Sequence, residues 1–142
     1  QAYGADNRPR ILTTLPPLYS WALNVAGEHA DVENLLPADV GPHDFQLKPR
    51  DLQRINSADV ILFNGLGLES WLLKTIEANR GKPGRIVVEA AAGLPTNALI
   101  YEVPELKVGA GRTAGHHHHH AGANPHLWLD PVFAQHTVTN LL

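Results

Sequence analysis

Nine histidines stand out in this sequence of 142 residues, which contains no cysteine. Two of them, His43 and His126, each follow a proline, lie in an expected loop and precede an expected helix. Two neutral imidazoles are a natural half of a zinc or manganese site, which needs further nitrogen or oxygen ligands. We therefore treat His43 and His126 as candidate metal ligands, with ordinary turn histidines as the alternative.

Five more histidines form an uninterrupted tract inside a glycine-rich segment: His116, His117, His118, His119 and His120. Imidazoles near their unperturbed pKa of about 6.5 are largely neutral at pH 7 and can bind a divalent metal. We expect an auxiliary metal collector whose binding is weak and multi-site, because no scaffold fixes its geometry. An affinity tag and a solvated loop without a function are the alternatives.

Signals for an enzyme are weak. Asp44, beside His43, suits a general base of a metallohydrolase, but no other group assembles around it in the sequence. The glycines of Gly65-Leu-Gly67 lack the third glycine and the lysine of a phosphate-binding loop. No nucleophile elbow and no His-Glu-x-x-His helix is present. His29 and His136 have no partner pattern, so we expect both to be structural or solvated.

Composition narrows the classes of partner. Eleven Lys and Arg against 14 Asp and Glu give a net charge of −3, which gives no support to nucleic-acid binding. With 44% hydrophobic residues the chain can bury one core, and its length suits one domain. No apolar run approaches the roughly 18 residues that a membrane span needs. Without cysteine, disulfides and thiolate metal sites are excluded.

Alternating strands and helices must position the histidines. Apolar runs predict strands at 10–15, 32–36, 59–63 and 85–89, and helical spacing predicts helices at 18–27, 48–57 and 69–79. This alternation is typical of βαβ units on a parallel sheet. We predict a three-layer α/β/α lobe with a mostly parallel sheet of about four strands. In such sheets the segments after the carboxyl ends of the strands form the ligand crevice, which is where His43 falls.

The pattern fades from about 95 to 125, a length at which loops are usually functional or mobile. Order returns at His126, and Asp130 is expected to cap a helix that begins at Pro131. We expect Trp128 and Leu129, which lie between them, to belong to the core.

Four motifs, in the same order, resemble the metal-specific solute-binding proteins of bacterial ABC importers, most closely the zinc-uptake type (ZnuA-like, related to TroA). They are Ile11-Leu-Thr-Thr-Leu-Pro-Pro-Leu-Tyr-Ser20, Gly41-Pro-His-Asp-Phe-Gln-Leu-Lys-Pro-Arg-Asp51, Asn64-Gly-Leu-Gly-Leu-Glu69 and Asn124-Pro-His-Leu-Trp-Leu-Asp-Pro131. Zinc members of that family often carry a histidine-rich loop between their first two histidine ligands. The tract here falls between His43 and His126.

The resemblance implies one amino-terminal lobe of a two-lobe receptor, spanning 1–142. It implies a flexible histidine-rich loop at about 104–123 and the start of the interlobe helix at about 131–142. His43 and His126 match the two ligands of that lobe, while a His or Glu and an Asp come from the other lobe in the family. Gln46 stands where many members have Glu, and no role is transferred to it. From this resemblance we expect the chain to be a fragment of a longer, two-lobe receptor.

The expected function is capture of Zn²⁺ in the periplasm, or at a lipid-anchored position outside the cytoplasmic membrane, and delivery to the membrane permease of an ABC importer. No catalysis, nucleic-acid binding or direct membrane insertion is expected. Mn²⁺ or Fe²⁺ is the alternative cargo, and a second copy of the chain is the alternative to the missing lobe. Two alternatives belong to other functional classes: a small zinc hydrolase, and a metal-linked oligomer or adhesin.

Overall fold

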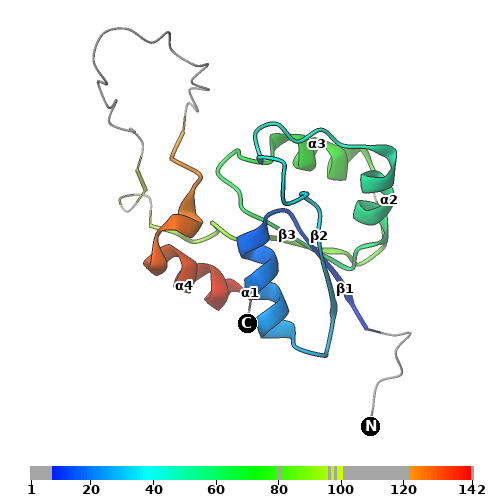
Figure 1. Ribbon diagram of the computed structural model, residues 1–142, viewed down its shortest axis with the longest axis horizontal. Coiled ribbons are helices and arrows are strands. Elements are labelled where there is room, and N and C mark those ends of the chain that lie inside the picture. Colours follow the sequence, from blue (N-terminus) through cyan, green and yellow to red (C-terminus); the bar gives the residue numbers. More distant parts are fainter. Residues whose placement is uncertain (1–7, 80, 96, 98, 101–121, 142) are drawn as a thin grey trace, which may run out of the picture.

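The computed structural model describes residues 8–79, 81–95, 97, 99–100 and 122–141 (Figure 1). The histidine tract and all but the last two residues of the expected loop at 104–123 lie outside this part of the chain. Within it the elements follow the order β1 (Arg10–Thr13), α1 (Pro16–Ala26), β2 (Asp31–Asn34), α2 (Pro49–Ser57), β3 (Val60–Phe63), α3 (Ser70–Ala78), β4 (Ile86–Glu89), η2 (Leu127–Leu129) and α4 (Pro131–Asn140).

The four strands form one sheet in the order β2-β1-β3-β4, and each neighbouring pair is parallel. Figure 1 shows α1 and α4 on one face of this sheet and α2 and α3 on the other. The predicted three-layer α/β/α fold with a parallel sheet is thus confirmed. Because the strands run the same way, their carboxyl ends meet at one edge, and the loops that leave them lie side by side.

The core lies on both faces of the two central strands. In β3 an unbroken apolar run is buried on both sides of the sheet, as expected for a central parallel strand. Ile61 of β3, Ile55 of α2 and Leu72 of α3 have no exposed surface, and Leu18 of α1 is 1% exposed. These side chains attach the helices to the sheet, so the loops at the carboxyl edge have a rigid base.

Proline and acidic side chains set the helix starts that the sequence predicts. Pro49 occupies the first turn of α2, and the Lys48 backbone N–H donates to Asp51 Oδ2 over 2.9 Å. In α4, Asp130 Oδ1 accepts from the Val132 backbone N–H over 2.8 Å, immediately before Pro131. Both helices begin where the expected caps stand.

One expectation for the core is wrong. Leu129 is 77% exposed, because η2 is a 3₁₀ turn with three residues per turn, and only Leu127 of its three side chains is buried. Trp128, in contrast, packs against the core. In β4 the apolar residues Ile86 and Val87 are 58% and 41% exposed, since β4 lies at the edge of the sheet.

A membrane span requires a helix that is both long and apolar, and none of those in the described part of the chain meets both requirements.

Candidate metal centre

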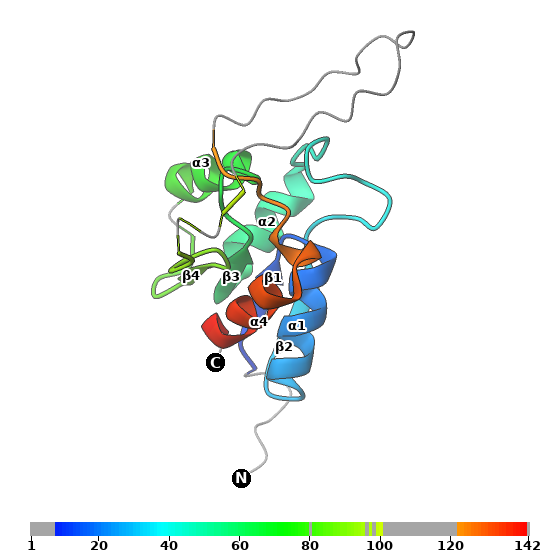
Figure 2. The same ribbon diagram turned by 90° about the vertical axis from the view of Figure 1, so that its left-hand side faces the viewer.

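The structure brings His43 and His126 together, although they are 83 positions apart. Their Nε2 atoms lie 3.4 Å from each other, and the ring centroids are 5.5 Å apart with the planes tilted by 52°. His43 comes from the loop between β2 and α2, and His126 stands immediately before η2. In Figure 2 the segment that leads into η2, drawn in orange, crosses one end of the sheet and continues beside α1.

The separation of the two nitrogens fits a shared cation. Zinc binds imidazole nitrogen at about 2.0–2.1 Å with tetrahedral angles, which places two such nitrogens about 3.3 Å apart. The observed 3.4 Å is close to that value, with the same nitrogen of each ring turned toward the other. The pair therefore has the spacing of two adjacent ligands of one tetrahedral ion.

One side chain fixes the state of the His126 ring. Asn124 Oδ1 accepts from the His126 backbone N–H over 3.0 Å and lies 2.7 Å from His126 Nδ1. Because a backbone N–H is always a donor, this Asn124 atom must be the amide oxygen, and Nδ1 must carry the proton. The lone pair is then on Nε2, which faces His43. Metal-ligating histidines are commonly oriented by such a bond at the other ring nitrogen.

Aromatic packing supports the two histidine segments. Phe45, two residues after His43, is 9% exposed, and its ring lies against Trp71 of α3 with centroids 5.0 Å apart. The Trp128 ring meets the His126 ring edge-on, with a centroid distance of 5.2 Å. The buried Phe45 ring thus anchors the loop of His43, and the partly buried Trp128 ring flanks His126.

A buried carboxylate organises the carboxyl edge of the sheet beneath the histidines. Glu69 is 2% exposed and accepts hydrogen bonds from Thr14 Oγ1 at 2.7 Å, the Asn64 backbone N–H at 2.9 Å and the Gly65 backbone N–H at 3.1 Å. Burial raises the pKa of Glu69, and these three hydrogen bonds oppose that rise. The carboxylate joins the residue after β1, the turn after β3 and the start of α3.

Sequence reasoning gave no role to Asn124, Asn64 or Glu69. For Asn124 a signal exists, because asparagine side chains commonly accept from the backbone two residues on, which here is His126. For Asn64 the decisive contact is with Pro125 O, at 2.8 Å and 61 positions away. Such a contact leaves no mark in local sequence.

The remaining candidates stand apart from the pair. Within the residues that the structure describes, no group of three His, Cys, Asp or Glu side chains can hold a metal, so Asp44 does not complete a three-ligand site. His29 is exposed, as expected. His136 Nε2 lies 2.8 Å from Ala92 O, a contact that attaches α4 to the turn after β4 and agrees with a structural role.

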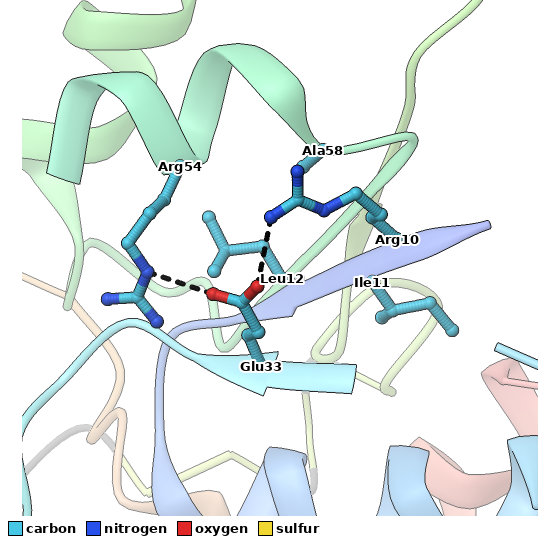
Figure 3. Close-up of a pocket in the computed structure, with 6 residues that line it drawn as sticks. All are labelled: Arg10, Ile11, Leu12, Glu33, Arg54 and Ala58. Atoms are coloured by element: carbon cyan, nitrogen blue, oxygen red, sulfur yellow. Dashed lines mark hydrogen bonds and ion pairs between the residues drawn. The ribbon is translucent and has the colours of Figure 1, made fainter. Parts of the chain in front are cut away.

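A small cavity lies elsewhere, between β1, β2 and α2 (Figure 3). Its volume of about 10 Å³ admits at most one water molecule, so it is no substrate pocket. Glu33 bridges Arg10 and Arg54 there, with N···O distances of 3.0 Å to each. Partial burial raises the pKa of Glu33, but the hydrogen bonds and charges of the two arginines outweigh it and lower that pKa.

Comparison with known proteins finds relatives that are named for metal uptake or metal binding. The family model described as "ZnuA: Zinc-uptake complex component A periplasmic" matches residues 11–142. The high-affinity zinc uptake system protein ZnuA of Bacillus subtilis is 30% identical over 131 residues, which is 92% of this chain and 39% of that protein. The iron-binding protein YfeA of Yersinia pestis is 31% identical over 144 residues, 96% of this chain and 40% of that protein.

Solved structures agree on the fold. Zn(II)-bound AdcA from Streptococcus pneumoniae superposes with a TM-score of 0.72 at 24% identity, covering 95% of this chain and 25% of AdcA. The solute-binding protein FpvC from Pseudomonas aeruginosa, in complex with Ni²⁺, gives a TM-score of 0.71 at 29% identity, covering 94% of this chain and 41% of FpvC. The chain thus spans between a quarter and about two fifths of the length of the curated relatives ZnuA, YfeA and AdcA.

Proposed function

Because this chain belongs to the ZnuA family, whose model matches residues 11–142, we propose that it binds Zn²⁺ through His43 and His126 for delivery to an ABC-type metal importer. The observation that carries the proposal is the 3.4 Å separation of the two Nε2 atoms. The bond from His126 Nδ1 to Asn124 supports it, since it directs a lone pair at the same point. The family relation supplies the transport role.

Two imidazoles are half of a tetrahedral site. They are neutral, so they leave the charge of a divalent ion uncompensated, and an ion held by them alone keeps about two waters. We propose that the remaining ligands, a His or Glu and an Asp, come from a carboxy-terminal lobe, as the family resemblance implies. Binding by the 142-residue chain alone is accordingly weaker than binding by a complete site.

Zinc is the proposed cargo, with Mn²⁺ or Fe²⁺ as the alternative. Nitrogen ligands suit zinc, whereas manganese favours sets rich in oxygen. The relatives include proteins named for zinc and for iron, and solved neighbours hold Zn²⁺, Ni²⁺ or Mn²⁺. The nitrogen pair and the histidine tract favour zinc. In this proposal the tract at 116–120 is an auxiliary collector that raises the local zinc concentration.

The proposed location is the periplasm, or a lipid-anchored position outside the cytoplasmic membrane. The name of the family model supports the first, and a relative named as a zinc-binding lipoprotein, AdcA of Streptococcus pneumoniae, supports the second. The proposed partners are the importer permease and the carboxy-terminal lobe. We propose no catalytic activity, since the family is one of transport proteins and Asp44 forms no three-ligand group with the described histidines.

A zinc titration with matched histidine variants tests the proposal. The parent chain has His116 to His120 replaced by serine, so that the tract does not obscure the paired site. His43→Ala and His126→Ala should each abolish the tightest class of binding, because either change leaves one nitrogen ligand. His29→Ala removes an exposed histidine outside the pair and should bind like the parent. Parent-like affinity in either ligand variant would contradict the assignment.

A further inference from the structure

We propose that Asn64 is a positioning residue for His126: its side-chain amide holds the peptide group from which the His126 ring extends. The inference rests on the proposed function, because it concerns how one proposed ligand is held. Asn64 lies at the end of β3 and is 2% exposed, so its amide needs hydrogen-bond partners within the protein.

The backbone of Asn64 is itself fixed. Its N–H donates to Glu69 Oε1 over 2.9 Å, and the next N–H, of Gly65, donates to Glu69 Oε2 over 3.1 Å. The same carboxylate accepts from Thr14 at the end of β1. The Glu69 carboxylate therefore binds both the backbone of Asn64 and the residue that follows the neighbouring strand β1. The position of the Asn64 side-chain amide is thus fixed relative to the sheet.

The Asn64 amide is the link from this base to the metal-binding segment. Its Nδ2 donates to Pro125 O over 2.8 Å and to Gly65 O over 3.2 Å. Pro125 is fully buried, and its carbonyl also accepts from the Leu127 backbone N–H over 2.8 Å, so Asn64 is the partner that connects this carbonyl to the sheet. The bond joins the sheet to a segment that lies 61 positions further along the chain.

Both polar groups of the Pro125–His126 peptide are held. Asn64 binds its carbonyl oxygen, and Asn124 Oδ1 accepts from its N–H over 3.0 Å. A peptide group is planar, so two bonds on opposite sides of it fix its orientation. Asn124 also accepts from Nδ1 of the ring, so the backbone and the ring of His126 are both oriented. Without the Asn64 side chain, the Pro125–His126 peptide loses its hydrogen bond to the sheet, and with it a contact that directs His126 Nε2 toward His43.

The test compares Asn64→Ser with Asn140→Ala in the parent chain that lacks the tract. Serine is too short to reach Pro125 O, while its backbone N–H still bonds to Glu69. Asn140 is a matched control: at the C-terminal end of α4, its amide donates to Ala90 O and Ala92 O and lies 3.3 Å from His136 Nε2, which is not one of the proposed ligands. We expect Asn64→Ser to weaken zinc binding 10- to 100-fold, as loss of a supporting contact at a metal site does, and Asn140→Ala to change it less than twofold.

A second readout needs no metal. Hydrogen exchange of the His126 backbone amide should speed up about tenfold in Asn64→Ser and stay unchanged in Asn140→Ala, since only the first removes the bond between this peptide and the sheet. Asn64→Asp, which keeps the size but replaces the donor by an acceptor, should do the same or more. Denaturant unfolding of each variant measures its stability. A loss of affinity that follows stability across all variants, Asn140→Ala included, would overturn the inference.

His126→Ala separates this inference from the proposed function. In a His126→Ala background, Asn64→Ser should cause no further loss of zinc affinity, because the residue it positions is gone. An equal further loss there would show that Asn64 acts elsewhere. If His126→Ala loses zinc while Asn64→Ser binds like the parent, the positioning role fails and the proposed function stands. If His126→Ala itself binds like the parent, the proposed function fails.

Discussion

At the scale of single residues, Asn124 decides which nitrogen of His126 faces outward. Its amide oxygen accepts from both the backbone N–H and Nδ1 of His126, at 3.0 and 2.7 Å. The ring therefore keeps its proton on the inner nitrogen, and Nε2 is able to bind a metal without first losing a proton. A supporting residue of this kind acts on affinity while never touching the ion.

Asn124→Ala tests this role. We expect zinc affinity to fall about 10- to 100-fold in the chain lacking the tract, because the ring becomes free to rotate and to exchange tautomers. Isothermal titration gives the affinity. Asn24→Ala, which removes an exposed amide bonded to Ser20 O on α1, is the control and should leave the affinity unchanged. Equal affinities in the two variants would show that Asn124 does not prepare the ligand.

At the scale of elements, Glu69 connects the ends of two strands to the start of α3, and its titration should be visible in stability. For a carboxyl whose folded pKa lies above its ordinary value of 4.5, the folded state binds more protons than the unfolded state. The free energy of unfolding therefore declines as the pH rises from 4.5 through the folded pKa. The buried position from which Glu69 connects these elements is therefore also the reason why its ionisation costs free energy.

Denaturant unfolding of Glu69→Gln and Glu33→Gln across pH checks the sign. The stability of the parent relative to Glu69→Gln should fall as the pH rises above 4.5. Glu33, whose pKa is lowered, should behave oppositely: its stabilising contribution is present above 4.5 and is lost as the pH falls through its folded pKa. The same slope for both variants would contradict the opposing environments of the two carboxyls.

The elements were largely predictable, but their long-range contacts were not. Apolar runs and helix caps are local, and they predicted the strands and the starts of α2 and α4 to within one or two residues. The order β2-β1-β3-β4, the approach of His43 to His126 and the contact of Asn64 with Pro125 arise from tertiary packing. The expected burial of Leu129 was wrong because η2 is a 3₁₀ turn, in which only Leu127 is buried.

At the scale of the whole molecule, several large apolar side chains are exposed, and two groups of them bear on what could cover this lobe. Leu129 and Val132, 77% and 68% exposed, lie just after His126, while Ile86 and Val87 lie on the edge strand β4. Exposed apolar surface of this kind is where proteins make contacts. Two arrangements are therefore in competition: a lobe that covers the histidine pair, or a second copy that supplies two more histidines.

Solution mass with and without zinc distinguishes these arrangements. For the chain lacking the tract we expect one chain per particle in both conditions, because a two-ligand site gives weak binding. Light scattering at matched protein concentrations measures it, with His43→Ala as the reference for mass changes unrelated to the pair. A twofold mass that appears only with zinc, and only when His43 is present, would instead show two chains sharing four histidines.

The distance along the chain between the two histidines has an energetic consequence. The 83 positions that separate them would form one closed loop around a shared ion, and an unfolded chain rarely brings such distant rings within 3.4 Å. Bound cargo therefore selects the folded ensemble, and its binding free energy adds to resistance against unfolding. The metal-bound protein is then more stable against unfolding than the metal-free protein, so each cycle of binding and release changes how long the folded state persists.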